Sequence, residues 1–194
     1  MPDFLEAYKI TMGNEGGYSK DPDDVGGETF KGISRRYNPQ WEGWEIIDAM
    51  KSHPNFPSIL KTMSNLDDSV HDFYKKLYWD SNSLDDCPSQ VIANEMFDTA
   101  VNMGRNRAAK FLQESLNYLN RNERIFDDLE VDGDIGPASL RALNFILDHG
   151  EEELLLKVLN VLQGSFYLEY MKKKPSQEKF MRGWFERVNL TTKG

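Results

Sequence analysis

The sequence contains few of the residues that mark several common classes of protein. Only one of its 194 residues, Cys87, is a cysteine, which excludes an internal disulfide and a metal cluster held by several thiolates. No residue near Cys87 in the sequence would activate it, so we expect a buried or inactive thiol. Three scattered histidines and the lack of an HExxH pattern give no basis for a zinc site. G-x-S-x-G, P-loop and dinucleotide-binding motifs are also absent.

Positive charge and long apolar runs are scarce as well. Lys and Arg number 23 against 32 Asp and Glu, which gives a net charge of −9. Nucleic acid is therefore excluded as the main partner, because binding to phosphates needs clustered cations. No stretch approaches the roughly 20 apolar residues of a membrane span. The N-terminal MPDFLEAYKI has neither a basic segment nor a long apolar run, so we expect no signal peptide.

Most of the chain shows the periodicity of helices. Hydrophobic residues make up 39% and charged residues 28%, as is typical of a globular protein. Apolar residues at helical spacing predict helices over 4–12, 44–50, 66–77, 88–103, 108–119, 137–147, 151–172 and 180–188. Pro88 and Pro137 are expected at the first positions of their helices, and the helix over 151–172 is expected to be central. Residues 29–33 predict a short strand or hairpin, and 120–136 a long loop or a subdomain boundary. The predicted fold class is mainly α with a small β element near the N-terminus.

The segment NEGGYSKDPDDVGGETFKGI, residues 14–33, is the strongest candidate for a chemical site. It follows a helix with one apolar face, formed by Phe4, Leu5, Tyr8 and Met12. Gly16 and Gly17 are expected to end this helix, which would place Glu15 at or near its C-terminus. The negative end of the helix dipole disfavours ionisation of a carboxyl group. Glu15 is therefore predicted to stay protonated and to act as a general acid.

A second carboxylate follows in the same segment. Asp24 lies nine residues after Glu15 and is the best candidate to assist it, with Asp21 and Asp23 as rivals. Thr29 follows five residues after Asp24. Gly27 and its neighbour allow the loop to fold back toward Glu15. Taken alone, DPDDVGG also fits an ordinary polar turn or a calcium-binding loop.

Several separated motifs resemble one family, the EGGY-motif muramidases and secretion activators of glycoside hydrolase family 108, which are similar to phage endolysins. The first is Glu15–Tyr18 with the DPDDVGGET and GI segments that follow it. The others are an F-D-x-A-V-N-x-G helix at 97–104, an FLQ…DG…GP pattern at 111–137 and G-W-x-x-R at 183–187. These motifs occur in the same order over most of the chain.

The resemblance implies a lysozyme-like fold and an N-acetylmuramidase that cleaves the β-1,4 bond between N-acetylmuramic acid and N-acetylglucosamine. Glu15 would be the catalytic acid, and Asp24 and Thr29 would hold the attacking water as in the inverting phage-type lysozymes, although Thr29 falls one residue early. The resemblance implies residues 1–85 as the catalytic lobe and 86–194 as a peptidoglycan-binding lobe of one compact unit. The partner would be glycan strands, and no cofactor is required. The enzyme would be made in the bacterial cytoplasm and act on the cell wall after release or export.

Several other residues have two possible roles, one in binding substrate and one in packing. Tyr18 and Gly27 are candidate substrate contacts, although Tyr18 also fits a role in packing the loop. Asp98 and Asn102 share one helix face and either line the cleft or fix helix packing. The turn at 131–137 is acidic, but a tight turn before a helix is preferred to a metal site. The tryptophans are candidate sugar platforms, with burial in the core as the commoner role: Trp41, Trp44, Trp79 and Trp184.

Two rival functions remain. A binding protein would keep the cleft without the activity, but it would have no need of an acid at Glu15. A lytic transglycosylase would use the glutamic acid without a carboxylate to hold water.

Overall fold

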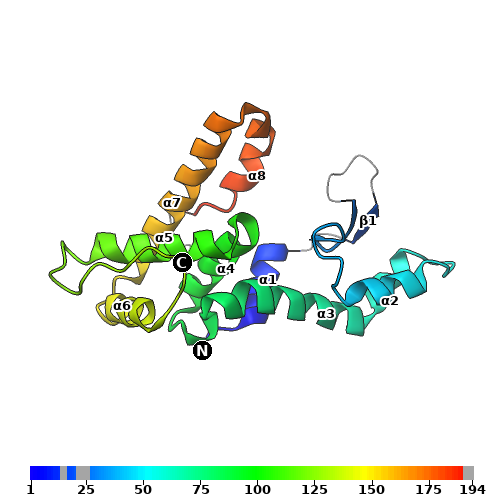
Figure 1. The fold of residues 1–194 in the computed structure, drawn as a ribbon, viewed down its shortest axis with the longest axis horizontal. Helices are drawn as coiled ribbons and strands as arrows, with labels where there is room; N and C mark the ends of the chain where they lie inside the picture. Colours follow the sequence, from blue (N-terminus) through cyan, green and yellow to red (C-terminus); the bar gives the residue numbers. More distant parts are fainter. Residues whose placement is uncertain (14–16, 21–26, 190–194) are drawn as a thin grey trace.

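The computed structural model describes residues 1–13, 17–20 and 27–189, and it consists of helices around a small sheet (Figure 1). The helices are α1 (Phe4–Met12), α2 (Gly43–Met50), α3 (Ser64–Tyr74), α4 (Gln90–Met103), α5 (Arg105–Leu119), α6 (Pro137–Asp148), α7 (Glu152–Lys173) and α8 (Met181–Phe185). Single turns of other helix types are η1 (Ser58–Thr62), η2 (Lys75–Trp79), η3 (Asp80–Asn82), η4 (Leu84–Asp86) and η5 (Pro175–Phe180). The strands are β1 (Tyr18–Lys20), β2 (Glu28–Phe30) and β3 (Ile33–Ser34). A mainly α fold with a small β element near the N-terminus is therefore confirmed.

Helix α4 lies at the centre of the core and packs against α1, α5 and α7. The ring of Phe4 from α1 packs edge-on against Trp79 and Phe97, with ring centroids 5.7 and 5.6 Å apart. Ser89 caps α4 by accepting a hydrogen bond from the amide of Ile92 at 3.1 Å. Pro88 therefore precedes the cap, and its predicted place inside the first turn is wrong. Because α4 contacts helices on both sides of residue 85, the division into lobes at that residue stays a prediction.

The sheet is antiparallel, in the order β1-β2-β3, and a tight turn connects β2 to β3. Phe30 and Ile33 flank a two-residue turn and are both buried. The turn residues Lys31 and Gly32 have φ of 43° and 79°, the left-handed region that such hairpin turns require. A side chain at Gly32 would place its Cβ 2.7 Å from the hydroxyl of Tyr74, so a close approach also requires glycine there.

The C-terminal half of α7 projects from the body together with α8 (Figure 1), and we call this half of α7, with the chain that follows it up to Arg187, the arm. In the arm the ring of Trp184 stacks on Tyr167, with centroids 4.9 Å apart and planes 11° apart. Helix α7 is therefore central only in part, as its exposed apolar residues show: Leu154, Val161 and Leu168. Pro137 is the first residue of α6, as predicted.

The long segment between α5 and α6 is irregular and is held by amide side chains of α5. Gln113 donates to Asp132 Oδ1 at 2.7 Å and accepts from the amide of Gly133 at 2.9 Å. Asn117 accepts from the amide of Leu129 at 2.8 Å. The FLQ and DG motifs therefore meet in space as a hydrogen-bonded turn. Within the described ranges no group of acidic, His or Cys side chains could hold a metal ion.

The burial of Leu5 differs from the sequence-based expectation, whereas that of Cys87 agrees with it. Leu5 is 54% exposed, so the buried side of α1 is formed by Phe4, Ala7 and Thr11 instead of a face that includes Leu5. Cys87 is buried, and its burial raises the pKa of the thiol to about 11, as expected of an inactive cysteine. Over the ranges given above, no helix combines the length and the apolar character needed to cross a membrane.

Candidate functional site

The end of α1 leads directly into the segment that carries the predicted acid. The helix ends at Met12, and the amide of Gly13 donates to the carbonyl of Lys9 at 3.0 Å. Gly13 has φ of 53°, so this glycine ends the helix and Gly16 and Gly17 do not. Glu15 and the candidates in the loop, Asp21, Asp23 and Asp24, lie outside the described residues.

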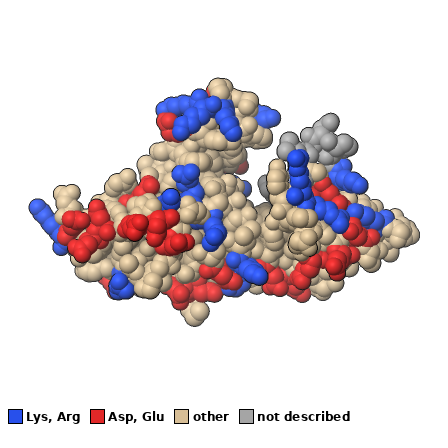
Figure 2. Space-filling model, viewed as in Figure 1, with Lys and Arg blue, Asp and Glu red and all other residues tan. Residues whose placement is uncertain are grey.

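A groove with a volume of about 680 Å³ begins at this end of α1. Its floor is formed by residues 10–13 and by the exposed Asn102, and one wall by the arm. The groove-facing residues of that wall are Lys179, Phe180, Gly183, Trp184, Glu186 and Arg187. Figure 2 shows a hollow between the arm and the part of the molecule that carries the hairpin. The predicted substrate contact Asn102 thus borders a space large enough for sugar units.

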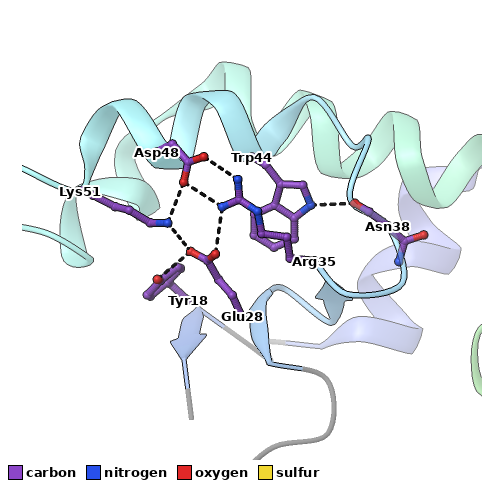
Figure 3. A network of polar contacts seen from close by, with 7 residues as sticks. All are labelled: Tyr18, Glu28, Arg35, Asn38, Trp44, Asp48 and Lys51. Carbon is purple, nitrogen blue, oxygen red and sulfur yellow. Dashed lines mark hydrogen bonds and ion pairs between the residues drawn. The ribbon is translucent and has the colours of Figure 1, made fainter. Parts of the chain in front are cut away.

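The hairpin that frames the loop is anchored by a charged network centred on Glu28 (Figure 3). One carboxylate oxygen of Glu28 accepts from the hydroxyl of Tyr18 and from Lys51, both at 2.8 Å. The other oxygen accepts from Arg35 at 2.9 Å. Arg35 and Lys51 in turn bind Asp48 on α2, at 2.5 and 2.6 Å. The network therefore fixes β1 and β2 to α2.

The charges in this network stabilise one another. Burial alone would raise the pKa of Glu28, but hydrogen bonds from Lys51, Tyr18 and Arg35 outweigh it and hold the pKa below its ordinary value. Hydrogen bonds from Arg35 and then Lys51 lower the pKa of Asp48 strongly. Arg35 also lies over the ring of Trp44, 5.2 Å from its centroid. Because these carboxylates are ionised, the two strand ends that flank 21–26 are held in place at neutral pH.

The described candidates in the hairpin occupy different environments. Thr29 is half-buried in the middle of β2, opposite Ser19 and Ser34. The ring of Tyr18 packs edge-on against Phe56, with centroids 4.8 Å apart, while its hydroxyl binds Glu28. Gly27 has φ of 66° and begins the return into β2. The described contacts of Tyr18 are thus with Phe56 and Glu28, and the substrate contacts of Tyr18 and Gly27 stay predictions.

Asp98 joins four elements just behind the groove. Its carboxylate accepts from Arg187 of the C-terminal segment at 2.5 Å and from Gln163 of α7 at 3.2 Å. Arg187 also donates to the carbonyl of Thr11 near the end of α1, at 3.4 Å. Asn102 donates to the backbone carbonyl of Asp98 at 2.8 Å. Asp98 thus has the helix-packing contacts expected of one of its two readings, and it links the arm to α1.

Sequence reasoning missed one titratable group beside this junction. Glu95 lies one turn before Asp98 on α4 and lines a cavity of about 580 Å³, which adjoins the groove at Ile10, Glu186 and Arg187. Burial, and then the charge of Asp98, raise the pKa of Glu95 to about 7. Burial also raises the pKa of Asp98, although Arg187 opposes the rise. The signal for Glu95 was an acid on the same buried helix side as Asp98, which the apolar pattern of α4 did not reveal.

The tryptophans divide between core and surface. Trp41, Trp44 and Trp79 are buried, so the core reading holds for these three. Trp184 alone among the four borders the groove. Of its groove neighbours, Gly183 was named only as part of the G-W-x-x-R motif and Phe180 only as an apolar helix position, and Lys179 was not singled out.

The sequence pattern described as Glycosyl hydrolase 108 matches residues 8–104, half of the chain. The chain belongs to this family. A second pattern, described as Predicted Peptidoglycan domain, matches residues 107–189. The two matches meet at the start of α5, and the groove is lined by residues from both.

A solved structure titled "Structure of Brucella abortus SagA" is similar over nearly the whole chain. The identity is 25% and the TM-score 0.62, with 95% of this chain and 88% of that chain covered. No curated protein matches the sequence. The fold class is the predicted lysozyme-like, mainly α class, and membership of the family together with the second domain supports a glycoside hydrolase that acts on peptidoglycan.

Proposed function

We propose that the protein is an N-acetylmuramidase that hydrolyses the β-1,4 bond between N-acetylmuramic acid and N-acetylglucosamine, with Glu15 as general acid. The observation that carries the proposal is the position of the groove. Its floor ends at Gly13, two residues before Glu15 in the sequence, within the part of the chain that matches Glycosyl hydrolase 108. This closeness in the sequence supports Glu15 as the acid that would act on a glycan in the groove.

The proposed chemistry needs two groups. Glu15 donates its proton to the oxygen of the leaving sugar, and Asp24 with Thr29 holds the water that attacks the anomeric carbon from the opposite face. The network around Glu28 supports this role of Asp24, because it fixes both strands that flank the loop. Asp24→Asn should therefore impair hydrolysis strongly while the hairpin stays folded.

The enzyme would be made in the bacterial cytoplasm and would act on the wall after release or export. Its substrate strands are neutral in their sugars and acidic in their peptides, whereas the protein itself carries a net charge of −9. Long-range attraction does not favour the encounter, so affinity has to come from contacts inside the groove.

The products distinguish the proposal from its two rivals. Digestion of purified walls by the wild-type protein should release fragments that end in reducing muramic acid, each heavier by one water than the transglycosylase product. Mass spectrometry that finds anhydro-muramoyl ends would replace hydrolysis by transglycosylation. Binding to walls without release of any fragment, at every pH from about 4 to about 9, would favour the non-catalytic binder.

A further inference from the structure

One side of the arm presents an aromatic and cationic surface to the groove. The residues that line it at the start and middle of this segment are Lys179, Phe180, Gly183 and Trp184. The spacing of four residues between Phe180 and Trp184 places their rings on the same side of the helix, 5.8 Å apart. These residues lie within the region that matches a peptidoglycan domain.

The two aromatic rings are available to a ligand. Phe180 is 46% exposed, although it lies in a groove wall where burial would be favourable. Trp184 is half-buried against Tyr167, Tyr170 and Phe180, and the rest of its surface borders the groove. Flat aromatic surfaces of this kind pack well against the apolar faces of sugar rings, and the indole N–H adds a hydrogen-bond donor.

Gly183 leaves open space in the wall next to Trp184. A Cβ built at this position meets no atom within 4 Å, so a larger side chain would project into free space. Glycine lowers helix stability by roughly 1 kcal/mol relative to alanine, and the backbone here does not require it by a left-handed conformation. A groove that must admit a ligand explains the glycine.

Lys179 supplies a positive charge at the same wall. Its ammonium lies 4.9 Å from the centroid of the Phe180 ring, and no ion pair to it is found within the described ranges. The other cation of the wall, Arg187, is already bound by Asp98, and the acid Glu186 lies at the opposite end, beside Arg187. A carboxylate entering near Phe180 would therefore meet an unneutralised ammonium.

We propose that this wall of the arm is a subsite for a peptide-bearing sugar of the glycan strand. Phe180 and Trp184 pack against the sugar ring, and Lys179 binds a carboxylate of the attached peptide. The proposal rests on the proposed function, because it takes peptidoglycan as the substrate, and it adds selection for strands that still carry their peptides.

Blocking the groove tests the sugar contact. In the Glu15→Gln background, which removes hydrolysis, binding to purified walls is measured by co-sedimentation for Gly183→Ala and Gly183→Leu. We expect Gly183→Leu to weaken binding about tenfold and Gly183→Ala much less, because leucine extends much farther into the open space beside Trp184. Both replacements favour helix over glycine, so an unchanged or raised thermal midpoint shows that the fold is intact. Equal binding by Gly183→Leu and the parent would overturn the subsite.

Lys179 is tested against a matched lysine. Lys174 also lies over an aromatic ring, 5.2 Å from the centroid of Tyr170, but it does not line the groove. Lys179→Gln should weaken binding to peptide-bearing walls about tenfold and leave binding to amidase-stripped glycan unchanged, whereas Lys174→Gln should change neither. The same small effect of both variants on both substrates would refute the carboxylate contact. If variants at residues 179 and 183 that still carry Glu15 cut walls as well as wild type does, the subsite proposal is refuted and the proposed function is not. If the wild-type protein binds walls but never cuts them, the proposed function is refuted and the subsite is not.

Discussion

Replacing Glu95 by glutamine should stabilise the protein above neutral pH and leave its stability at acid pH almost unchanged. Glu95 is half-buried beside Asp98, and the hydroxyl of Thr99 donates to its carboxylate at 3.5 Å. Burial and the charge of Asp98 raise its pKa from the ordinary value of 4.5 to about 7. The folded protein therefore binds this proton more tightly than the unfolded chain does.

The sign and size of the effect follow from that difference. The stabilising contribution of the proton is complete below the unfolded pKa and is lost as the pH rises through the folded pKa. A difference of about 2.5 units at about 1.4 kcal/mol per unit gives a loss of about 3 kcal/mol by about pH 8. Glutamine has a similar shape and no charge to bury, so Glu95→Gln avoids this loss.

Urea unfolding of wild type and Glu95→Gln, at about pH 4 and about pH 8, measures the prediction directly. Glu153→Gln is the control, because Glu153 is an exposed acid paired with Lys157 at 2.6 Å and should change stability by less than about 1 kcal/mol at either pH. An equal effect of Glu95→Gln at both pH values, or no gain at the higher one, would refute the raised pKa of Glu95.

Two further predictions concern the contacts that frame the groove. Arg187→Ala should lower the free energy of unfolding by about 2 kcal/mol, because it leaves the carboxylate of Asp98 without its cation. A double-mutant cycle with Asp98→Asn, measured by urea unfolding, should give a coupling energy of similar size. Additive effects of the two substitutions would contradict the pairing. Glu28→Gln should weaken the network of Figure 3, reduce wall lysis several-fold and lower the free energy of unfolding by about 1 kcal/mol. The control Glu45→Gln, at an exposed site on α2, should change neither turbidity clearing nor the unfolding midpoint. Full activity of Glu28→Gln would show that the anchored hairpin is not needed.

The sequence predicted the elements whose signals are local. Helices α1, α2, α5 and α6 begin and end close to their predicted residues, because caps, prolines and glycines act on their immediate neighbours. The fold class and the hairpin followed from the same kind of signal. Leu5 was misplaced because an apolar stripe gives the period of a helix but cannot show which of two adjacent residues faces the core.

The groove was beyond sequence reasoning for a different reason. Its wall on the arm comes from residues 179–187 and its floor from residues 10–13, and only tertiary packing brings these segments together. The pairing of Arg187 with Asp98 joins two motifs that are 89 residues apart. Periodicity within either motif contains no information about the other, so the junction and the raised pKa of Glu95 emerged only from the structure.

The central claim is that Glu15 supplies the proton for cleavage, and one substitution tests it most directly. Glu15→Gln keeps the shape of the side chain but removes its acidic proton, so the initial rate of wall hydrolysis should fall at least about a hundredfold. The thermal midpoint should stay at the wild-type value, and the surface control Glu45→Gln should hydrolyse walls at the wild-type rate. Wall hydrolysis by Glu15→Gln at the wild-type rate would contradict the account.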